Sequence, residues 1–323
     1  MNYEQLDYSA LDDKTISRKD FSKEQLAAAG VKNQMMPIVL PMVAFIVGMV
    51  VYGTALTSDF LLLIISVPVL IGMLIVVISL GKRQLRVLKF ALDNQAYFSA
   101  AKTTPPSQPI MFNIGHRRIQ TNTFVFHDGA SLAKYQYTTG SGKNQQTHFF
   151  NYMQITLPRQ VPHLFINGKK NAVNPNTFEY KVEKLKLEGD FSKHFDLLVP
   201  PGYQRDALQI LTPDVMAALI DFGKEYDFEL IGSELYIYQS GMFSKELFTS
   251  AEKLRTFLTA VDKISSQFGK QTKTYSDLRA GNVSSNLVAT EGAKFKKRSL
   301  TWLYAAIIVI VLCYMILSFI YLV

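Results

Sequence analysis

The sequence predicts an α+β cytoplasmic domain, a mostly antiparallel sheet with two packed helices, joined to three transmembrane α-helices. Three apolar runs without a charged side chain occupy residues 37–57, 60–80 and 300–323. Residues 110–199 alternate with period two and are rich in aromatic and β-branched side chains, which is typical of strands. Two later stretches, 212–226 and 244–268, have the apolar spacing of amphipathic helices.

Each apolar run is long enough to cross a bilayer as a helix. About 20 residues at roughly 1.5 Å per residue match a hydrocarbon layer of about 30 Å. We therefore expect a multi-pass protein of the cell membrane, with a helical hairpin at 35–81, a C-terminal helix at 299–323 and the lipid bilayer as a partner. A cleaved signal peptide is the alternative for the first run, but its leader is long and carries several acidic residues.

Basic residues beside the apolar runs predict the orientation, because Lys and Arg flanking membrane segments stay on the cytoplasmic side. The membrane-orienting residues are Lys82, Arg83, Arg86, Lys89, Lys294, Lys296, Lys297 and Arg298. This places the N-terminus and the main domain in the cytoplasm and the C-terminus outside. The same residues could attract anionic lipid headgroups.

The charge of the remaining domain argues against nucleic acid as a partner. Residues 90–293 hold 21 Lys and Arg against 19 Asp and Glu, so the net charge of +8 comes from the clusters beside the apolar runs. A domain this close to neutral lacks the broad basic surface that phosphate binding requires. The single cysteine, Cys313, offers no disulfide framework and no cysteine-based metal site.

The chain divides into five parts in sequence order. Residues 1–34 form a cytoplasmic N-terminal tail with one short helix, in which Ser22 and Gln25 have the spacing of a capping box and Gly30 ends the helix. The hairpin at 35–81 follows. The cytoplasmic α+β domain, residues 82–268, begins with a helix over 82–102 that leads away from the bilayer. A flexible basic linker over 269–298 and the last helix complete the chain.

The period-two region predicts the strands of the sheet. The expected strands are 124–127, 132–138, 147–157, 163–166, 182–189 and 195–199. The sequence His127-Asp128-Gly129 predicts a tight turn between the first two.

The next stretch predicts the two helices. Residues 207–211 have the pattern of a strand, and Thr212-Pro213-Asp214 supplies a cap, a first-turn proline and an early carboxylate for a helix to Tyr226. Gly232-Ser233 between two apolar runs predicts a two-residue hairpin loop. A long helix then runs over 244–268.

One set of residues resembles a known family. Leu187-Glu188, Phe191, Phe195 and the run Leu211-Thr212-Pro213 with Met216 are similar to the L-E-x-x-F…F-x-V and L-T-P-x-x-M pattern of a broad family of uncharacterised bacterial membrane proteins, a domain of unknown function. The resemblance covers about 50 residues. It implies a cytoplasmic domain after two membrane helices in a bacterial protein, and it implies no activity.

The sequence nominates no catalytic, cofactor or metal site. Gly140-Ser141-Gly142-Lys143 lacks the flanking residues of a phosphate-binding loop, which favours a hairpin loop. The five histidines, 116, 127, 148, 163 and 194, lack metal-site spacing. Glu188, Asp190 and Asp196 could pair as carboxylates, although a solvent-exposed face beside lysines is the simpler interpretation. The aromatics at 135, 137, 149, 150 and 152 could stack on a ligand or pack across strands.

These observations favour a non-catalytic binding or scaffold domain, presented at the inner leaflet to an unknown protein partner. The alternative is a membrane-associated enzyme whose site is assembled from distant segments, which a deep pocket holding two or more of the named His, Asp or Glu side chains would favour. A third possibility is a small oligomeric channel lined by Thr54, Ser66, Ser79 or Ser318.

Overall fold

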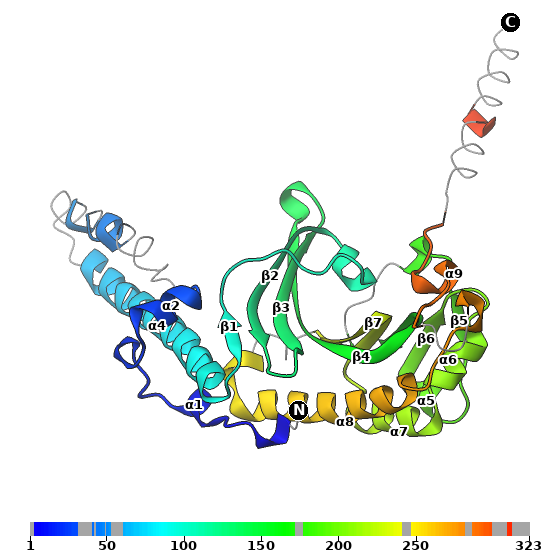
Figure 1. Cartoon of the computed structure of the whole chain (residues 1–323). Coiled ribbons are helices and arrows are strands. Elements are labelled where there is room, and N and C mark those ends of the chain that lie inside the picture. Colours follow the sequence, from blue (N-terminus) through cyan, green and yellow to red (C-terminus); the bar gives the residue numbers. More distant parts are fainter. Residues whose placement is uncertain are drawn as a thin grey trace, which may run out of the picture.

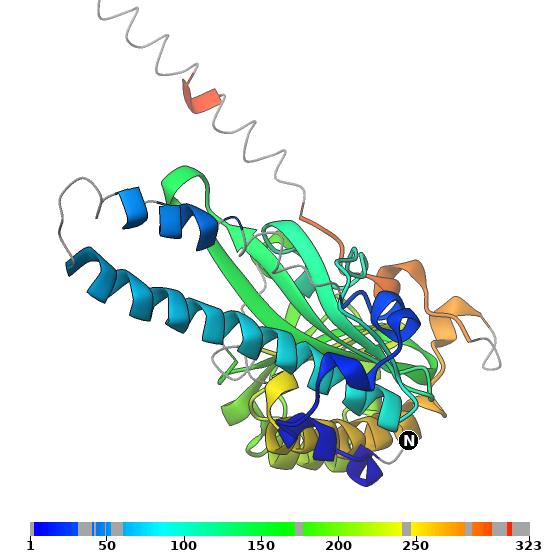
Figure 2. The same cartoon turned by 90° about the vertical axis from the view of Figure 1, so that its left-hand side faces the viewer.

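The computed structural model describes residues 3–31, 41, 43–48, 50–52, 61–171, 177–240, 247–281, 286–298 and 309–311. Across these residues the fold is a sheet-rich α+β arrangement, in which seven strands form one antiparallel sheet. Figure 1 shows helices α7 and α8 lying beneath the sheet and α4 running along its side, and Figure 2 shows α4 from the side that it covers. The predicted antiparallel α+β domain is therefore confirmed.

The sheet is a chain of antiparallel neighbours, joined both by short turns and by long connections that hold helices. Its strands are β1 (Tyr97–Ser99), β2 (His116–Val125), β3 (Ser131–Thr139), β4 (Gln146–Gly168), β5 (Glu183–Leu185), β6 (Phe195–Val199) and β7 (Asp227–Gln239). Their order is β1-β2-β3-β4-β6-β5, and β7 pairs with β4 outside this path. The turn between β2 and β3 lies where the sequence predicts it, with Gly129 at a φ of +83°.

Strands β4 and β7 form a long, strongly bent ribbon. They pair from Asn151–Gln239 to Ile166–Phe228, with two irregularities in register between them. The bend brings both ends of β7 to one side chain: the Asn171 amide donates to Asp227 Oδ2 at 2.6 Å and accepts from the Ser240 backbone N–H at 3.1 Å.

The hairpin predicted at Gly232-Ser233 is wrong, because β7 is one strand of 13 residues. Gly232 does adopt a positive φ of +59°. It lies at the irregular part of the ribbon, opposite Val161. A glycine that permits a bulge and one that permits a turn look alike in sequence.

The helices are α1 (Ser9–Asp12), α2 (Lys23–Ala28), α4 (Leu61–Asp93), α5 (Phe191–His194), α6 (Gln204–Ile210), α7 (Pro213–Phe222), α8 (Ala251–Thr272) and α9 (Thr290–Ala293). Of these, α6, α7 and α8 pack on one face of the sheet, and α4 runs along its side. Helix α8 begins seven residues later than the sequence predicts, where the Ser250 side chain accepts from the Lys253 backbone N–H. Its buried stripe includes the predicted Leu254, Leu258 and Phe268.

Helix α7 begins where the sequence predicts, with Pro213 in its first turn, but the Thr212 side chain makes no capping hydrogen bond and the helix ends at Phe222, before the predicted Tyr226. The strand predicted at 207–211 is wrong, since Ala207 and Ile210 belong to α6 and point into the core. A short stretch with four apolar residues and Gln209 between them suits a strand or one side of a short helix equally well.

A second core, largely aromatic, fills the opposite face of the sheet. It contains Tyr135, Tyr137, Phe150 and Tyr152, and residues 110–112 cover it. The Phe112 ring lies 5.0 Å from the Tyr135 ring and 4.8 Å from the Tyr152 ring, both edge to face. Of the five aromatics that could have formed an exposed stacking surface, these four are buried, so the packing interpretation is confirmed for them.

The transmembrane prediction is contradicted. No helix among the described residues combines the length and the apolar character needed to cross a bilayer. The three transmembrane helices and the multi-pass localisation, with a cytoplasmic domain and an outer C-terminus, are therefore not supported. The second apolar run continues in α4 to Asp93, where Leu88 and Phe90 pack in the core. The helix predicted over 82–102 therefore follows this run, but it ends at Asp93, and residues 97–99 form β1 instead. Most of the first and third runs lies outside the described residues.

The N-terminal tail belongs to the folded body, contrary to the solvated tail that the sequence predicts. Tyr3, Tyr8 and Leu26 are buried in the core beside α4 and α8. The predicted capping box is confirmed, with the Gln25 backbone N–H donating to Ser22 Oγ at 3.1 Å and the Ser22 N–H donating to Gln25 Oε1 at 2.9 Å.

Candidate functional site

Buried polar side chains gather on the β4–β7 ribbon and on the segment that follows α8. On the ribbon and just after it these are Asn151, His163, Asp227, Glu229 and Ser240. We call residues 275–281 and 286–298 the strap. Asp277 is its buried acidic residue. Since burying a polar group without partners is costly, the partners of these groups show what they do.

Glu229 lies at the centre of the first cluster. Its Oε1 accepts from the Ile110 backbone N–H at 2.7 Å and contacts His163 Nε2 at 2.7 Å, while Oε2 accepts from the Tyr238 hydroxyl at 2.9 Å. Glu229 and His163 are both completely buried. One carboxyl group therefore holds the segment before β2, the middle of β4 and the far end of β7.

His163 connects Glu229 to the strap. Its Nδ1 accepts from the Phe295 backbone N–H at 2.9 Å, so the proton of the ring lies on Nε2 and is donated to Glu229. The Phe295 ring stacks on the imidazole with 3.8 Å between centroids and 14° between planes. Both nitrogens of His163 are thus used in holding chain segments.

Asp227 forms a second cluster at the end of the ribbon. Its Oδ1 accepts from the Gly168 backbone N–H at 2.7 Å, and its Oδ2 accepts from the Asn171 amide. Burial raises the pKa of Asp227 well above its ordinary value, and these two hydrogen bonds offset only part of that rise. The group closes the bent ribbon on itself through Asn171.

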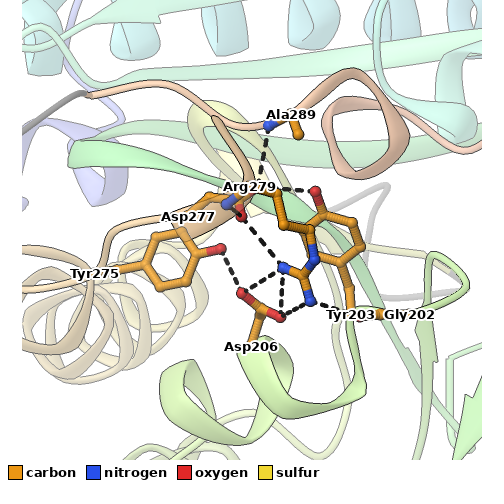
Figure 3. Close-up of polar contacts among 7 residues, drawn as sticks. All are labelled: Gly202, Tyr203, Asp206, Tyr275, Asp277, Arg279 and Ala289. Atoms are coloured by element: carbon orange, nitrogen blue, oxygen red, sulfur yellow. Dashed lines mark hydrogen bonds and ion pairs between the residues drawn. The ribbon is translucent and has the colours of Figure 1, made fainter. Parts of the chain in front are cut away.

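A third cluster, the Arg279 clasp, holds the strap to α6 (Figure 3). The Arg279 guanidinium binds Asp206 with N–O distances of 3.0–3.2 Å and donates to the Gly202 carbonyl at 2.7 Å. It also lies 4.2 Å above the centre of the Tyr203 ring. The Tyr275 hydroxyl donates to Asp206 at 3.0 Å. The strap is therefore fixed to α6 by the ion pair between Arg279 and Asp206, and the guanidinium also packs on the Tyr203 ring.

Asp277 joins the two halves of the strap within the clasp. It accepts from the Tyr203 hydroxyl at 2.8 Å, the Ala289 N–H at 3.0 Å and the Arg279 N–H at 3.0 Å. Burial alone raises the pKa of Asp277, but these hydrogen bonds together outweigh it and hold the pKa below the ordinary 3.8. Hydrogen bonding to Asp206 raises the pKa of Arg279 above its usual range. Gly292 lies against the Tyr203 ring, with no room for a Cβ.

The end of the strap pairs with residues 179–181 as a short antiparallel strand. The Lys181 N–H donates to the Lys296 carbonyl at 2.8 Å and the Arg298 N–H donates to the Glu179 carbonyl at 2.7 Å. Tyr180 and Lys297 form the bridge between them. The flexible linker predicted for 269–298 is thus, in its described residues, the last turn of α8 followed by a packed strap.

The predicted membrane-orienting residues lie on two folded elements. Lys82, Arg83, Arg86 and Lys89 are on α4, where Arg86 donates to the Leu11 carbonyl at 2.9 Å and Lys89 pairs with Asp93. Lys294, Lys296, Lys297 and Arg298 are on the strap. The structure uses several of them within the fold, and their attraction to anionic lipid headgroups stays a prediction.

The residues that carry the family resemblance lie mostly in the core. Leu187, Phe191, Phe195 and Leu211 are buried between the sheet and the helices, whereas Glu188 is exposed. Thr212 and Pro213 begin α7, and Met216 packs against the same core. The pattern therefore marks packing and a helix start, and these residues form no common polar site.

The other candidates are dispersed. The predicted hairpin loop at 140–143 is confirmed as the connection between β3 and β4. His148 contacts the Thr139 hydroxyl at 2.7 Å, and His116 and His127 are exposed at strand ends. Asp190 pairs with Lys193, and Asp196 with Lys169 and Lys184, which fits the solvent-exposed interpretation. No group of three His, Cys, Asp or Glu in the described chain could hold a metal ion.

Three surface hollows are lined by described residues. The first, of about 560 Å³, lies between the end of α4 and the β2–β3 turn and is lined by Asp93, Asn94, Gln95, His127 and Asp128. The second, of about 400 Å³, separates residues 6–12 from the start of α8. A smaller one, of about 120 Å³, is lined by Lys181, Pro200, Pro201, Glu291 and Lys296 beside the strap. None of the three is lined by Asp227, Glu229 or Asp277.

Sequence reasoning missed Glu229, Asp277, Arg279 and Phe295. Glu229 and Asp227 alternate with apolar residues at the start of β7. Such alternation is typical of a strand with one solvent-exposed face, so it did not indicate that both acids are buried. The partners themselves, His163 and Phe295, are separated by 132 residues and had no local signal.

Comparisons with known proteins add little. No protein-family model matches the chain, and no curated protein matches it. A solved structure with some similarity is the crystal structure of the mycobacterial trehalose monomycolate transport factor A, TtfA, at 8% sequence identity and a TM-score of 0.38, covering 56% of this chain and 91% of that chain. A similarity at this level supports no argument about fold or function. The resemblance to the uncharacterised bacterial family stays a prediction.

Proposed function

We propose that the chain is a non-catalytic binding or scaffold module, whose folded body fixes its strap as a rigid surface for a protein partner. One observation carries this proposal. The three buried carboxyl groups, Asp227, Glu229 and Asp277, all accept hydrogen bonds from segments of the chain itself. These carboxyl groups therefore hold irregular backbone segments in place by hydrogen bonding.

The strap offers a contact surface because it is rigid and partly apolar. Leu278 is 72% exposed and Leu287 is 57% exposed, next to residues that the Arg279 clasp holds. Apolar side chains on a pre-ordered segment bind with little loss of conformational entropy. Such exposed anchors are typical of interaction sites.

The enzyme alternative requires titratable groups that converge on an accessible pocket. His163 and Glu229 do converge, but both are completely buried and all their described contacts are structural. Of the residues nominated from sequence, His127 lines a described hollow beside Asp128, and no second nominated residue joins it. No observation in the described chain therefore favours this alternative over the binding module.

Site-specific photocrosslinking in cells tests the proposal. A photoreactive phenylalanine analogue is introduced into the full chain at Leu278 or Leu287, and as matched controls at Tyr97 on β1 or Phe222 on α7, which are also exposed. We expect one discrete cross-linked protein product at the strap positions and none at the controls. The strap product should be lost when Arg279→Ala releases the clasp.

Two results would contradict the proposal. The first is no discrete product at any of the four positions in a chain that is folded by circular dichroism. The second is the same set of products at all four, which would indicate non-specific collision with neighbouring proteins.

A further inference from the structure

We infer that the place occupied by Phe295 is a recognition site for an extended peptide segment in which an aromatic residue precedes basic residues. We call this place the seat: His163 together with residues 179–181. The inference rests on the proposed binding function and names the partner's chemistry. Residues 295–298, Phe-Lys-Lys-Arg, occupy the seat in the free chain as an internal ligand.

The backbone of the strap is bound as a peptide is bound in strand addition. Residues 179–181 present one N–H and one carbonyl to it, at 2.8 Å to Lys296 and 2.7 Å to Arg298. These hydrogen bonds involve only backbone atoms, so any extended segment can form them. The selectivity of the seat has to come from its side chains.

The first selective contact is the aromatic slot on His163. The Phe295 ring is 3% exposed, stacked on the imidazole at 3.8 Å and flanked by the Tyr180 ring at 6.3 Å. The backbone N–H of Phe295 also donates a hydrogen bond to His163 Nδ1. A planar side chain that stacks while its own N–H bonds to the same imidazole fits this slot, and an aliphatic one loses the stack.

The second selective contact is acidic. Lys297 lies 3.8 Å from Glu179, Lys296 lies 3.9 Å from Glu291, and Arg298 Nε donates to the Tyr180 carbonyl at 2.9 Å. The two ion pairs are exposed, so they contribute little affinity. Glu291 belongs to the strap itself, whereas Glu179 belongs to the seat and disfavours an acidic residue at the position of Lys297, which helps to select a basic one.

The seat can be vacated without releasing the rest of the strap. Upstream, the strap is held independently by Asp206, Asp277 and Arg279, and none of these residues contacts Phe295 or the residues after it. The end of the strap depends on one aromatic ring and a few backbone hydrogen bonds. A partner segment of the same chemistry can make the same contacts, but it also loses translational and rotational freedom, so the tethered segment competes with it and weakens its binding to the unsubstituted chain.

Fluorescence anisotropy with a labelled peptide tests the inference on the full chain. The probe is Ala-Lys-Phe-Lys-Lys-Arg, the sequence of residues 293–298, and the control peptide has Ala in place of Phe. The chain with Phe295→Ala, whose aromatic slot is empty and whose strap end keeps only its backbone and exposed side-chain contacts, should bind the probe at least tenfold more tightly than the control peptide. The unsubstituted chain should bind the probe at least tenfold more weakly than the substituted one.

Equal binding of the two peptides to the Phe295→Ala chain, or no binding while this chain still unfolds cooperatively, overturns the inference. If Phe295→Ala prevents folding, Phe295→Leu serves instead, because it keeps most of the buried volume and loses the stack on His163. Hydrogen exchange of the Lys181 amide gives a second measurement, since the probe should restore its protection. Failure here with strap photocrosslinks intact refutes the seat alone, whereas failure of both refutes the binding module.

Discussion

Replacing Glu229 separates the hydrogen-bonding role of its carboxyl group from its charge. In Glu229→Ala three buried donors, the Ile110 N–H, His163 Nε2–H and the Tyr238 hydroxyl, lose their acceptor. Each buried donor left unpaired costs about 1–3 kcal/mol, so we expect the free energy of unfolding to fall by about 3–9 kcal/mol. For a domain with a total of about 5–15 kcal/mol this is close to unfolding.

Glu229→Gln should be far milder. The amide oxygen can take the place of Oε1, which accepts from both Ile110 and His163. The amide N–H₂ then faces the Tyr238 hydroxyl, which can turn and accept instead of donating. All three contacts survive as neutral hydrogen bonds, so we expect a loss of no more than about 1.5 kcal/mol.

Urea unfolding followed by far-ultraviolet circular dichroism measures both variants, and hydrogen exchange at Ile110 and Phe295 locates the effect. Glu234→Ala is the matched control, because Glu234 lies on the same strand, is half-buried and contacts Gln154 and Thr156 at its surface. It should cost less than about 1 kcal/mol. Equal losses for the Gln and Ala variants would show that the charge, and not the geometry of the acceptors, holds the cluster.

Three further substitutions test the strap. Phe295→Ala should lower the free energy of unfolding by about 3 kcal/mol, from lost ring burial, and should expose residues 293–298 to limited proteolysis. Asp277→Asn should destabilise the chain by about 1–3 kcal/mol at pH 7. Because the folded-state pKa of Asp277 is below 3.8, that difference should shrink as the pH falls through it, as urea unfolding at pH 7 and pH 3 would show. Gly292→Ala should cost about 1–3 kcal/mol by thermal melting, since a Cβ would meet Tyr203 at 2.2 Å, whereas Gly269→Ala in α8, with open space, should be neutral or stabilising.

Local signals predicted those parts of the fold that depend on neighbours in sequence. The capping box of Ser22 and Gln25, the Thr212-Pro213 helix start and the turn at Gly129 each need only a few adjacent residues. Their physical causes, a capped N–H or a positive φ, act over one turn of chain. Such elements could therefore be identified before the structure.

The candidate site could not be predicted in the same way. His163 and Glu229 are 66 residues apart, Arg279 and Asp206 are 73 apart, and both pairs depend on how far the β4–β7 ribbon bends and where the strap returns. Apolar runs misled for a related reason. Hydropathy shows that a stretch such as 60–80 is apolar, but it does not show what the helix contacts. The contacts of α4 depend on the three-dimensional packing of the whole chain.

Backbone N–H groups outside regular secondary structure explain why this fold needs buried carboxyl groups. Residues 110, 289 and 295 lie in connecting segments or at the start of a helical turn. Their backbone N–H groups therefore have no partner within regular secondary structure. Glu229 accepts from the first, Asp277 from the second, and His163 from the third while itself bonded to Glu229. A carboxyl group has several lone-pair sites and can serve two or three donors that approach from different elements. An apolar side chain of the same size would fill the space and leave those N–H groups unpaired. Glu229, through His163, and Asp277 therefore help the body to hold its strap, and under the proposed function a partner bound to the strap would depend on them without touching them.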